Sequence, residues 1–472
     1  SRVVDILDGR SRERFVLTQP SIIIADEILP SDLAQIERRY ALGFITVGGS
    51  YQSHANIIAR TMGIPSICSV DDEEILNPLN NGKMLCMDGS TGEIYLGAVE
   101  TKEGGDNENF VTILDWADKY AHMHVYANAD TPEEVANAVR FGAQKVGLCR
   151  TEHMFRGKDR LFIMQQMILA DTTEERCKYL DMLEKFQEED FYGMYMAANK
   201  GGKNININVR LLDPPLDEYL PIKEEDIVAL AEAAGKPVEK VKARIEWLHQ
   251  TNPMMGLRGC RLDVVYPEIG AMQGRAVIKA AIRAQKDLGT KVTASMMVPQ
   301  VVAAREFKFC KKIVTAEADK LIAAAGVELD YVIGTMIETP RSAVTAGEIA
   351  PEANYFSYGT NDLTQFTFGF SRNDYSTYIN EYLANNLIDF DPFKTLDDNG
   401  VGALIAMSVK AGKEANPELQ CGICGEAGGD PESIELFHKY GCDYVSCSPF
   451  RVPGARLAAA QATIKAEGKY KY

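Results

Sequence analysis

The sequence predicts an α/β protein in which a small α/β domain precedes a (β/α)8 barrel. Its 472 residues are too many for one ordinary core. From residue 111 onward, eight short apolar runs alternate with longer stretches of helical spacing, which is the strand count of a (β/α)8 barrel. A polar, glycine-containing segment without periodicity precedes this part and is typical of a linker. We therefore expect a small domain over residues 1–100, a linker over 101–110 and the barrel over 111–472.

The first 100 residues contain the elements of a compact α/β unit. Two apolar runs, at residues 21–25 and 43–47, predict buried strands. Helical spacing follows each of them, at residues 30–40 and 53–62, and the second helix ends at a glycine, where a left-handed cap is expected. Two further runs around a glycine-containing turn, within residues 83–96, predict a β-hairpin.

The eight barrel strands are predicted from apolar runs of four or five residues. They cover residues 124–127, 146–149, 205–209, 294–298, 334–337, 355–358, 421–424 and 444–447. The largest insertion, residues 214–250, is expected to form two amphipathic helices after the third strand.

Composition excludes several classes of protein. The formal net charge of −17 repels nucleic acid and anionic lipid at long range, so any bound phosphate needs a local cluster of cations. No apolar run approaches the roughly 20 residues of a membrane helix, and the N-terminus lacks a secretory pattern, so we expect neither a membrane protein nor a secreted one. The ten cysteines lie mostly in apolar runs, as free thiols do in a reducing cytoplasm.

Charged side chains gather where the predicted strands end, which is where the active site of such a barrel lies. Arg150 and Arg210 end the second and third strands, and Arg258 precedes the fourth. Glu338 and Asp362 follow the fifth and sixth. Arginine forks bind phosphate oxygens, and carboxylates are ligands that Mg²⁺ accepts, so this set predicts a site for a small phosphorylated acid and a divalent metal. Taken singly, each arginine is equally well explained as a structural ion pair.

Two cysteines have CxxC spacing. No second such pair completes a zinc site, and a thioredoxin-like pair would open a helix rather than lie in a strand. We expect Cys421 to be a packed thiol and Cys424, at the strand end, to be a proton donor in the barrel mouth. A packed thiol remains the alternative for Cys424.

His54 follows a glycine pair and Ser53 at the start of a predicted helix. Ser53 is a good N-cap, and the amides of the first turn favour a phosphate beside the ring. A histidine in this place suits a transient phosphohistidine, although a histidine after two glycines is more often structural.

Long runs in the barrel part resemble those of phosphoenolpyruvate (PEP)-utilising enzymes, in particular the C-terminal half of pyruvate phosphate dikinase. These runs are VYANADTP at 125–132, GLCRTEHMF at 147–155, RLLDPP at 210–215, NPMMGLRGCR at 252–261, GTNDLTQ at 359–365 and VSCSPFRVP at 445–453. Residues 20–68 are more similar to the phosphohistidine domain of Enzyme I of the sugar phosphotransferase system, through LPSDLAQ at 29–35 and the residues around His54.

This resemblance implies a swivelling phosphohistidine domain and a reversible conversion of PEP into pyruvate with Mg²⁺. By it, His54 is the phosphorylated histidine and Cys424 is the acid and base for the enol carbon. The side chains that would hold the substrate and the metal are Arg150, Arg210, Arg258 and Asn361 for the substrate, and Glu338 and Asp362 for Mg²⁺. It also implies a homodimer, and the cysteine pattern described above predicts a cytoplasmic location.

The chain departs from the dikinase pattern at several places. Nothing in it corresponds to the ATP-grasp half of those enzymes, and the residues before His54 leave no room for the helical domain with which Enzyme I docks its phosphocarrier. Gln300 stands where dikinases have leucine in Pro-Leu-Val, and Asp217 and Ala427 stand where they usually have histidine. We therefore expect either a piece of a longer enzyme or a chain that works with a separate ATP-grasp subunit or phosphocarrier protein.

Three functions remain open. The first is the PEP/pyruvate half of a dikinase-type phosphotransferase. The second is an Enzyme I-like donor that passes phosphate from His54 to a partner protein. The third is a homologue that binds PEP without turnover, against which the retained His54, Cys424 and metal carboxylates speak.

Overall fold

The computed structural model describes residues 19–26, 28, 40–48, 64–72, 74–89, 91–99, 108–199 and 205–468. The chain forms two compact units, Ser1–Asp106 and Asn107–Tyr472. Helix α4 (Glu108–Tyr120) begins inside the linker expected over 101–110, so its last three residues are helical. The rest of that linker lies outside the described residues.

The small unit contains a parallel sheet in the order β1 (Ser21–Ala25), β2 (Ala41–Thr46), β3 (Ser66–Ile67). The short strand β3 was not expected. The hairpin of β4 (Leu85–Asp88) and β5 (Glu93–Leu96) is antiparallel, as the sequence predicts. The predicted helix over 53–62 lies outside the described residues, and of the one over 30–40 only Tyr40 is described.

The hairpin packs on the sheet at a glycine. A Cβ atom on Gly43 in β2 would lie 2.4 Å from Sδ of Met87 in β4, so a side chain at this position would force Met87 to move. Phe44 and Ile45 are buried beside it and form the centre of this small core.

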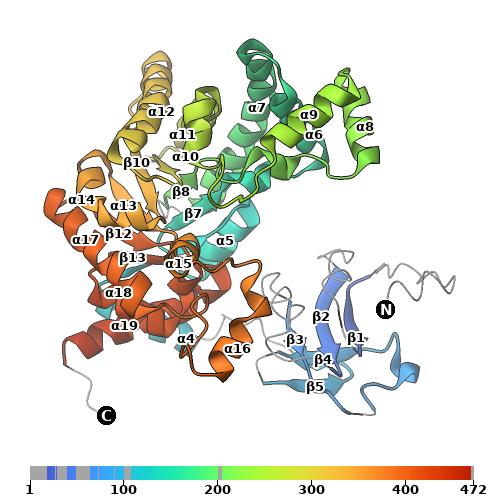
Figure 1. Ribbon diagram of the computed structural model, residues 1–472. Coiled ribbons are helices and arrows are strands. Elements are labelled where there is room, and N and C mark those ends of the chain that lie inside the picture. Colours follow the sequence, from blue (N-terminus) through green and yellow to red (C-terminus); the bar gives the residue numbers. More distant parts are fainter. Residues whose placement is uncertain are drawn as a thin grey trace. The chain divides into compact units, whose positions relative to one another are not determined.

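The large unit is a closed barrel of eight parallel strands surrounded by helices (Figure 1), and all eight predicted strands are confirmed. The strands are β6 (His124–Asn128), β7 (Val146–Arg150), β8 (Ile207–Arg210), β9 (Thr293–Val298), β10 (Asp330–Ile337), β11 (Tyr355–Tyr358), β12 (Gln420–Ile423) and β13 (Tyr444–Cys447). Strand β13 pairs with β6 and closes the barrel.

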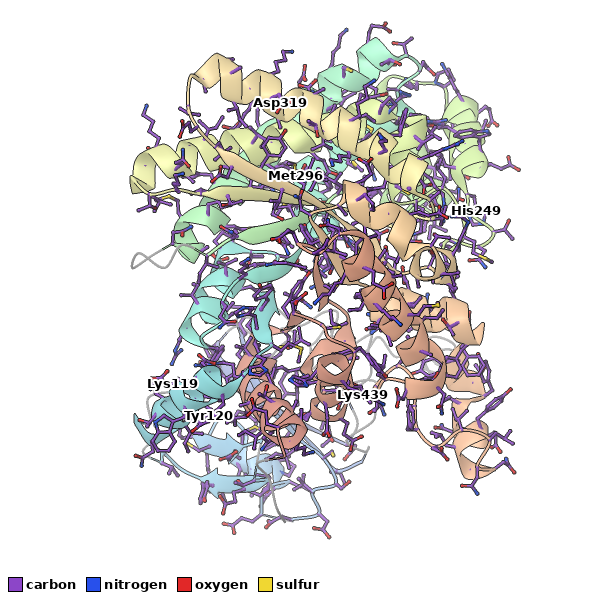
Figure 2. The ribbon with its side chains drawn as sticks, turned by 90° about the vertical axis from the view of Figure 1, so that its left-hand side faces the viewer. Lys119, Tyr120, His249, Met296, Asp319 and Lys439 are labelled. Carbon is purple, nitrogen blue, oxygen red and sulfur yellow. The ribbon has the colours of Figure 1, made fainter. Side chains whose placement is uncertain are left out.

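Helices follow each strand and cover the outside of the barrel. They are α5 (Pro132–Arg140), α6 (Lys158–Leu169), α7 (Thr173–Ala198), α8 (Glu224–Ala234), α9 (Val238–Leu248), α10 (Cys260–Val265), α11 (Pro267–Leu288), α12 (Ala304–Ala325), α13 (Pro340–Val344), α14 (Ala346–Ile349), α15 (Thr360–Phe368), α16 (Ile379–Ala384), α17 (Ala403–Ala415), α18 (Pro431–Lys439) and α19 (Val452–Ala466). In Figure 2, Met296 lies in the barrel wall and Asp319 lies on α12 outside it. Among the described residues, no helix is both long and apolar enough to span a membrane.

Local sequence explains where two of these helices begin. Thr131 and Thr172 are the N-caps of α5 and α7, and each hydroxyl accepts a hydrogen bond from the amide three residues later, in both cases a glutamate. The same glutamates, Glu134 and Glu175, accept a hydrogen bond from the amide that precedes the cap, at 2.7 Å in both helices. These reciprocal bonds satisfy amide donors that a helix start leaves free.

The insertion after β8 has its own core. As predicted, it contains two helices, α8 and α9, whose buried side chains Leu230 and Val241 join a cluster with Leu180 and Leu183 of α7. The insertion is therefore held by hydrophobic burial and is part of the barrel unit.

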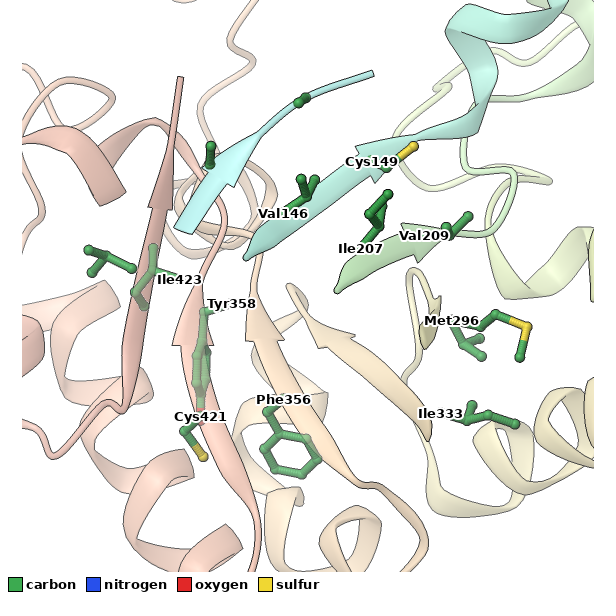
Figure 3. Packing of buried hydrophobic residues seen from close by; sticks show 14 of the residues in the cluster. Val146, Cys149, Ile207, Val209, Met296, Ile333, Phe356, Tyr358, Cys421 and Ile423 are labelled. Atoms are coloured by element: carbon green, nitrogen blue, oxygen red, sulfur yellow. The ribbon is translucent and has the colours of Figure 1, made fainter. Parts of the chain in front are cut away.

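Side chains along each strand alternate between the helices and the barrel interior. Ile207, Val209, Met296, Cys421 and Ile423 belong to the main hydrophobic cluster between strands and helices (Figure 3). The residues in between form a smaller cluster that fills the barrel, made up of Leu148, Met297, Met336, Tyr355 and Cys424. This two-residue period decides which residues at the strand ends face the mouth.

Candidate active site at the barrel mouth

The predicted site residues of the barrel lie at the carboxyl ends of its strands. Arg150 and Arg210 are the last residues of β7 and β8 and are opposite each other in the strand register. Glu338 directly follows β10, and Cys424 directly follows β12. Asn361 and Asp362 are in the first turn of α15, which follows β11. Because the strands are parallel, all these positions lie at one end of the barrel.

Arg258 reaches this end from the loop before α10. The loop is fixed by two backbone hydrogen bonds, from Gly259 N–H to the carbonyl of Asp213 (2.8 Å) and from Cys260 N–H to the carbonyl of Pro299 (3.1 Å). These bonds place Arg258 between the ends of β8 and β9.

Asp213 ties two of the arginines together. Arg258 donates to both of its carboxylate oxygens, at 3.3 and 2.6 Å, and Arg210 Nη1 lies 3.0 Å from Oδ2. Burial would raise the pKa of Asp213, but the charges of Arg210 and Arg258 outweigh it and lower this pKa. Arg210 also pairs with Glu152. The two guanidinium groups are therefore held in fixed positions before any ligand binds.

Arg150 is the most accessible of the three arginines. Its Nε donates to Asp130 at 3.0 Å, and His153 Nδ1 lies 2.8 Å from the same oxygen. Its side chain is 38% exposed, compared with 11% for Arg210 and Arg258. Arg150 is therefore the arginine of the three whose side chain is most open to solvent.

Glu338 and Asp362 form a buried carboxylate pair. The backbone N–H of Gln300 donates to Glu338 Oε1 at 2.7 Å, and the Gln300 side-chain amide donates to Asp362 Oδ2 at 2.6 Å. Burial, followed by the charges of Asp362 and Asp213, raises the pKa of Glu338 to about 8. Burial also raises the pKa of Asp362, although Arg258 Nη2, 3.2 Å from its Oδ2, acts in the opposite direction.

The residues present fit a divalent cation. Asp130, Glu152 and Asp213 pair with the three arginines. The charge of Asp362 contributes to the raised pKa of Glu338, and a bound cation would relieve this repulsion between the two carboxylates. Among the described residues, no group of three or more histidine, cysteine, aspartate or glutamate side chains is arranged around one point. Two carboxylates suit Mg²⁺, which takes few protein ligands and completes its shell with water and substrate oxygens.

Gly359 makes room for this pair. A Cβ atom at this position, directly after β11, would lie 2.4 Å from Glu338 Oε2. A side chain here would therefore displace the carboxylate from the mouth.

The two cysteines of the CxxC pair face opposite sides of the barrel wall. Cys421 packs in the main cluster against the helices, whereas Cys424 belongs to the inner cluster. Burial is the main cause that raises the pKa of the Cys424 thiol to about 12, with a further contribution from Glu338. Cys424 is therefore a protonated thiol at neutral pH, as a proton donor requires.

The sequence did not identify every residue of the mouth. Asp130, Glu152, Asp213 and Gln300 hold the predicted arginines and carboxylates but were given no role. Three of them are acidic residues near a strand end, and this position was the feature of the sequence that could have identified them. Asn361 is half-buried in α15 beside Asp362. His54 lies outside the described residues.

Comparison with known families identifies both units. Residues 105–464 match the model of the PEP-utilising enzyme, PEP-binding domain, and residues 17–92 match that of the PEP-utilising enzyme, mobile domain. This chain belongs to the PEP-utilising enzymes.

Several of its curated relatives in this PEP-utilising family are pyruvate, phosphate dikinases. The chain is 46% identical over 453 residues to pyruvate, phosphate dikinase of Clostridium symbiosum. This alignment covers 94% of this chain and 51% of the relative. It is 43% identical to that of Giardia intestinalis (94% and 51%) and 44% identical to the chloroplastic pyruvate, phosphate dikinase 1 of Arabidopsis thaliana (94% and 46%). The chain thus spans about half the length of the curated relatives it matches.

Proposed function

We propose that this chain transfers the phosphoryl group of PEP reversibly to His54 and releases pyruvate. The observation that carries the proposal is the mouth of the barrel, where three arginines, a buried carboxylate pair and a protonated thiol meet. The match of the same residues to a PEP-binding domain supports PEP as the substrate.

Each side chain of the mouth has a part in this proposal. Arg150, Arg210 and Arg258 bind the phosphate of PEP, because guanidinium forks match its oxygens. Asn361 holds the carboxylate of the substrate. Asp213 and Asp130 keep the arginines oriented, which saves the entropy of ordering them when the substrate binds.

Glu338 and Asp362 would hold Mg²⁺, with water and substrate oxygens completing its shell. When bound, the cation would offset the negative charge that develops on the enolate and phosphate oxygens. Gln300 and Arg258 keep the carboxylates in place through the contacts described above.

The reaction needs a proton at the enol carbon, and we propose Cys424 as its donor. The bond between phosphorus and the enol oxygen breaks, and a bond forms between phosphorus and a ring nitrogen of His54. The remaining enolate takes the thiol proton of Cys424 at its methylene carbon and becomes pyruvate. The thiolate regains a proton from water, and the reverse reaction uses the same groups.

For the other side of His54, we propose exchange with an ATP-grasp domain or subunit, because the curated relatives are dikinases. A phosphocarrier protein, as used by Enzyme I, is not favoured by any of these relatives. We also propose a cytoplasmic homodimer that binds neither nucleic acid nor membranes. All ten cysteines are free, which suits a reducing compartment.

The proposal is tested by incubating the full chain with PEP and Mg²⁺. We expect an acid-labile phosphoryl adduct in the intact mass and one equivalent of pyruvate. Both should be lost in His54→Ala and kept in His249→Ala, whose ring lies on the exposed surface beyond α9 (Figure 2). An unchanged mass together with tight PEP binding would instead favour the homologue without turnover.

A further inference from the structure

Among the residues that the structure describes, Gln300 alone donates hydrogen bonds to both carboxylates of the proposed metal site. It lies directly after β9 and is completely buried. Its backbone N–H donates a hydrogen bond to Glu338 Oε1, and its side-chain Nε2 donates one to Asp362 Oδ2. The leucine expected here from the resemblance to dikinases could form the first bond but not the second.

The backbone at Gln300 is built for this contact. Its φ of +59° lies in the left-handed region, which costs a residue with a side chain about 1 kcal/mol. Gly259 gives it space, because a Cβ atom there would lie 2.7 Å from Cβ of Gln300. The Cys260 thiol donates to its carbonyl at 3.3 Å. An unfavourable backbone conformation that Gly259 and Cys260 support points to a local purpose.

The two bonds leave one oxygen of each carboxylate without a short hydrogen bond. Among the described residues, Glu338 Oε2 accepts none, and Asp362 Oδ1 accepts only a 3.3 Å bond from Gln365. Asp362 Oδ2, in contrast, accepts a hydrogen bond from Gln300 and forms an ion pair with Arg258. Each carboxylate can therefore offer a cation one oxygen more readily than two.

The number of available oxygens bears on which cation is bound. Ca²⁺ takes six to eight oxygen ligands and often both oxygens of a carboxylate, whereas Mg²⁺ is octahedral and takes single oxygens together with water. Gln300 Oε1 is a buried acceptor with no partner in the described part of the chain. A water molecule of the Mg²⁺ shell would be a suitable donor for such an acceptor.

We propose that Gln300 is a specificity-determining residue of the metal site. Its side-chain amide favours Mg²⁺ over Ca²⁺ by restraining Asp362 to one ligand oxygen, while its backbone N–H restrains Glu338 in the same way. This inference rests on the proposed function, because it takes Glu338 and Asp362 as the metal ligands. It concerns this chain in particular, since the side-chain contact requires glutamine.

The test measures metal binding without PEP. Full-length protein is freed of metal, and the dissociation constants of Mg²⁺ and Ca²⁺ are measured by calorimetry for the wild type, Gln300→Met and Gln300→Glu. Methionine keeps the length of the side chain but donates nothing to Asp362, and glutamate replaces the donor by a further carboxylate. We expect the preference for Mg²⁺ over Ca²⁺ to fall at least fivefold in Gln300→Met and further in Gln300→Glu.

The matched control is Gln365→Met, which removes an amide from the other oxygen of Asp362 and should leave the preference unchanged. Thermal melts identify any variant that has not folded, and Gln300→Glu then carries the test. An unchanged preference in folded Gln300 variants would overturn the inference and leave the proposed function standing. Absence of divalent-metal binding by the wild type without PEP would overturn the inference, and its absence in the presence of PEP as well would overturn both.

Discussion

Cys421 and Cys424 show how strongly the function of a residue depends on its strand position. They are three residues apart, so the alternation of a strand sends them to opposite faces of the barrel wall. The sequence alone already distinguishes Cys424, at the strand end, from Cys421, within the strand. The pairing of Asp213 with Arg258, in contrast, joins residues 45 positions apart and has no local signature.

At this scale, we predict that Cys424→Ala still binds PEP but exchanges the methyl protons of pyruvate at least ~100-fold more slowly, since a positioned acid contributes about that much. Cys421→Ala serves as the matched control and should keep its exchange rate, because its side chain faces the helices. Proton exchange into deuterated solvent, followed by NMR, measures both. Equal rates in the two variants would remove Cys424 from its proposed role.

Short elements connect the site to the packing around it. Helix α10 begins two residues after Arg258 and carries Asp263, whose buried carboxyl group lies beside the first turns of α11, close to Gly270. Burial raises the pKa of Asp263 to about 7. The sequence predicts neither this burial nor the turn at Gln300, because both arise from neighbours distant along the chain.

Asp263 makes the stability of the barrel depend on pH. The unfolded carboxyl group ionises near pH 4, whereas the folded one keeps its proton up to about pH 7, so this contribution to stability is lost as the pH rises through that interval. We predict that Asp263→Asn gains roughly 2 kcal/mol relative to the wild type between about pH 5.5 and pH 7. Chemical denaturation at both pH values measures it, with Asp226→Asn on the exposed face of α8 as the control for losing one negative charge. A pH-independent difference would contradict the prediction.

At the scale of the whole molecule, the chain consists of two compact units with separate cores. Eight strands and the two-helix insertion could be predicted from apolar runs, because each run carries its own periodicity. Closure of the barrel could be expected from the strand count, but the pairing of β13 with β6 joins residues far apart in sequence. The short β3 was missed, since two residues carry no periodic pattern.

We therefore predict two calorimetric unfolding transitions. Oxalate with Mg²⁺, which resembles the enolate of pyruvate but has no phosphoryl group, should raise the midpoint of the larger transition by mass action and leave the smaller one unchanged. Asp362→Asn should abolish this shift, because it removes one of the two proposed carboxylate ligands of Mg²⁺. One joint transition that moves as a whole would show that the units unfold together.

The sequence by itself determined the order of elements and the kinds of side chain at the strand ends, because both follow from local patterns of apolar and polar residues. Only the tertiary structure decided which carboxylates pair with which arginines and that Gln300 joins Glu338 to Asp362. Those contacts depend on how loops from different strands meet over the barrel. That meeting is set by closure of the whole sheet, which no short stretch of sequence encodes.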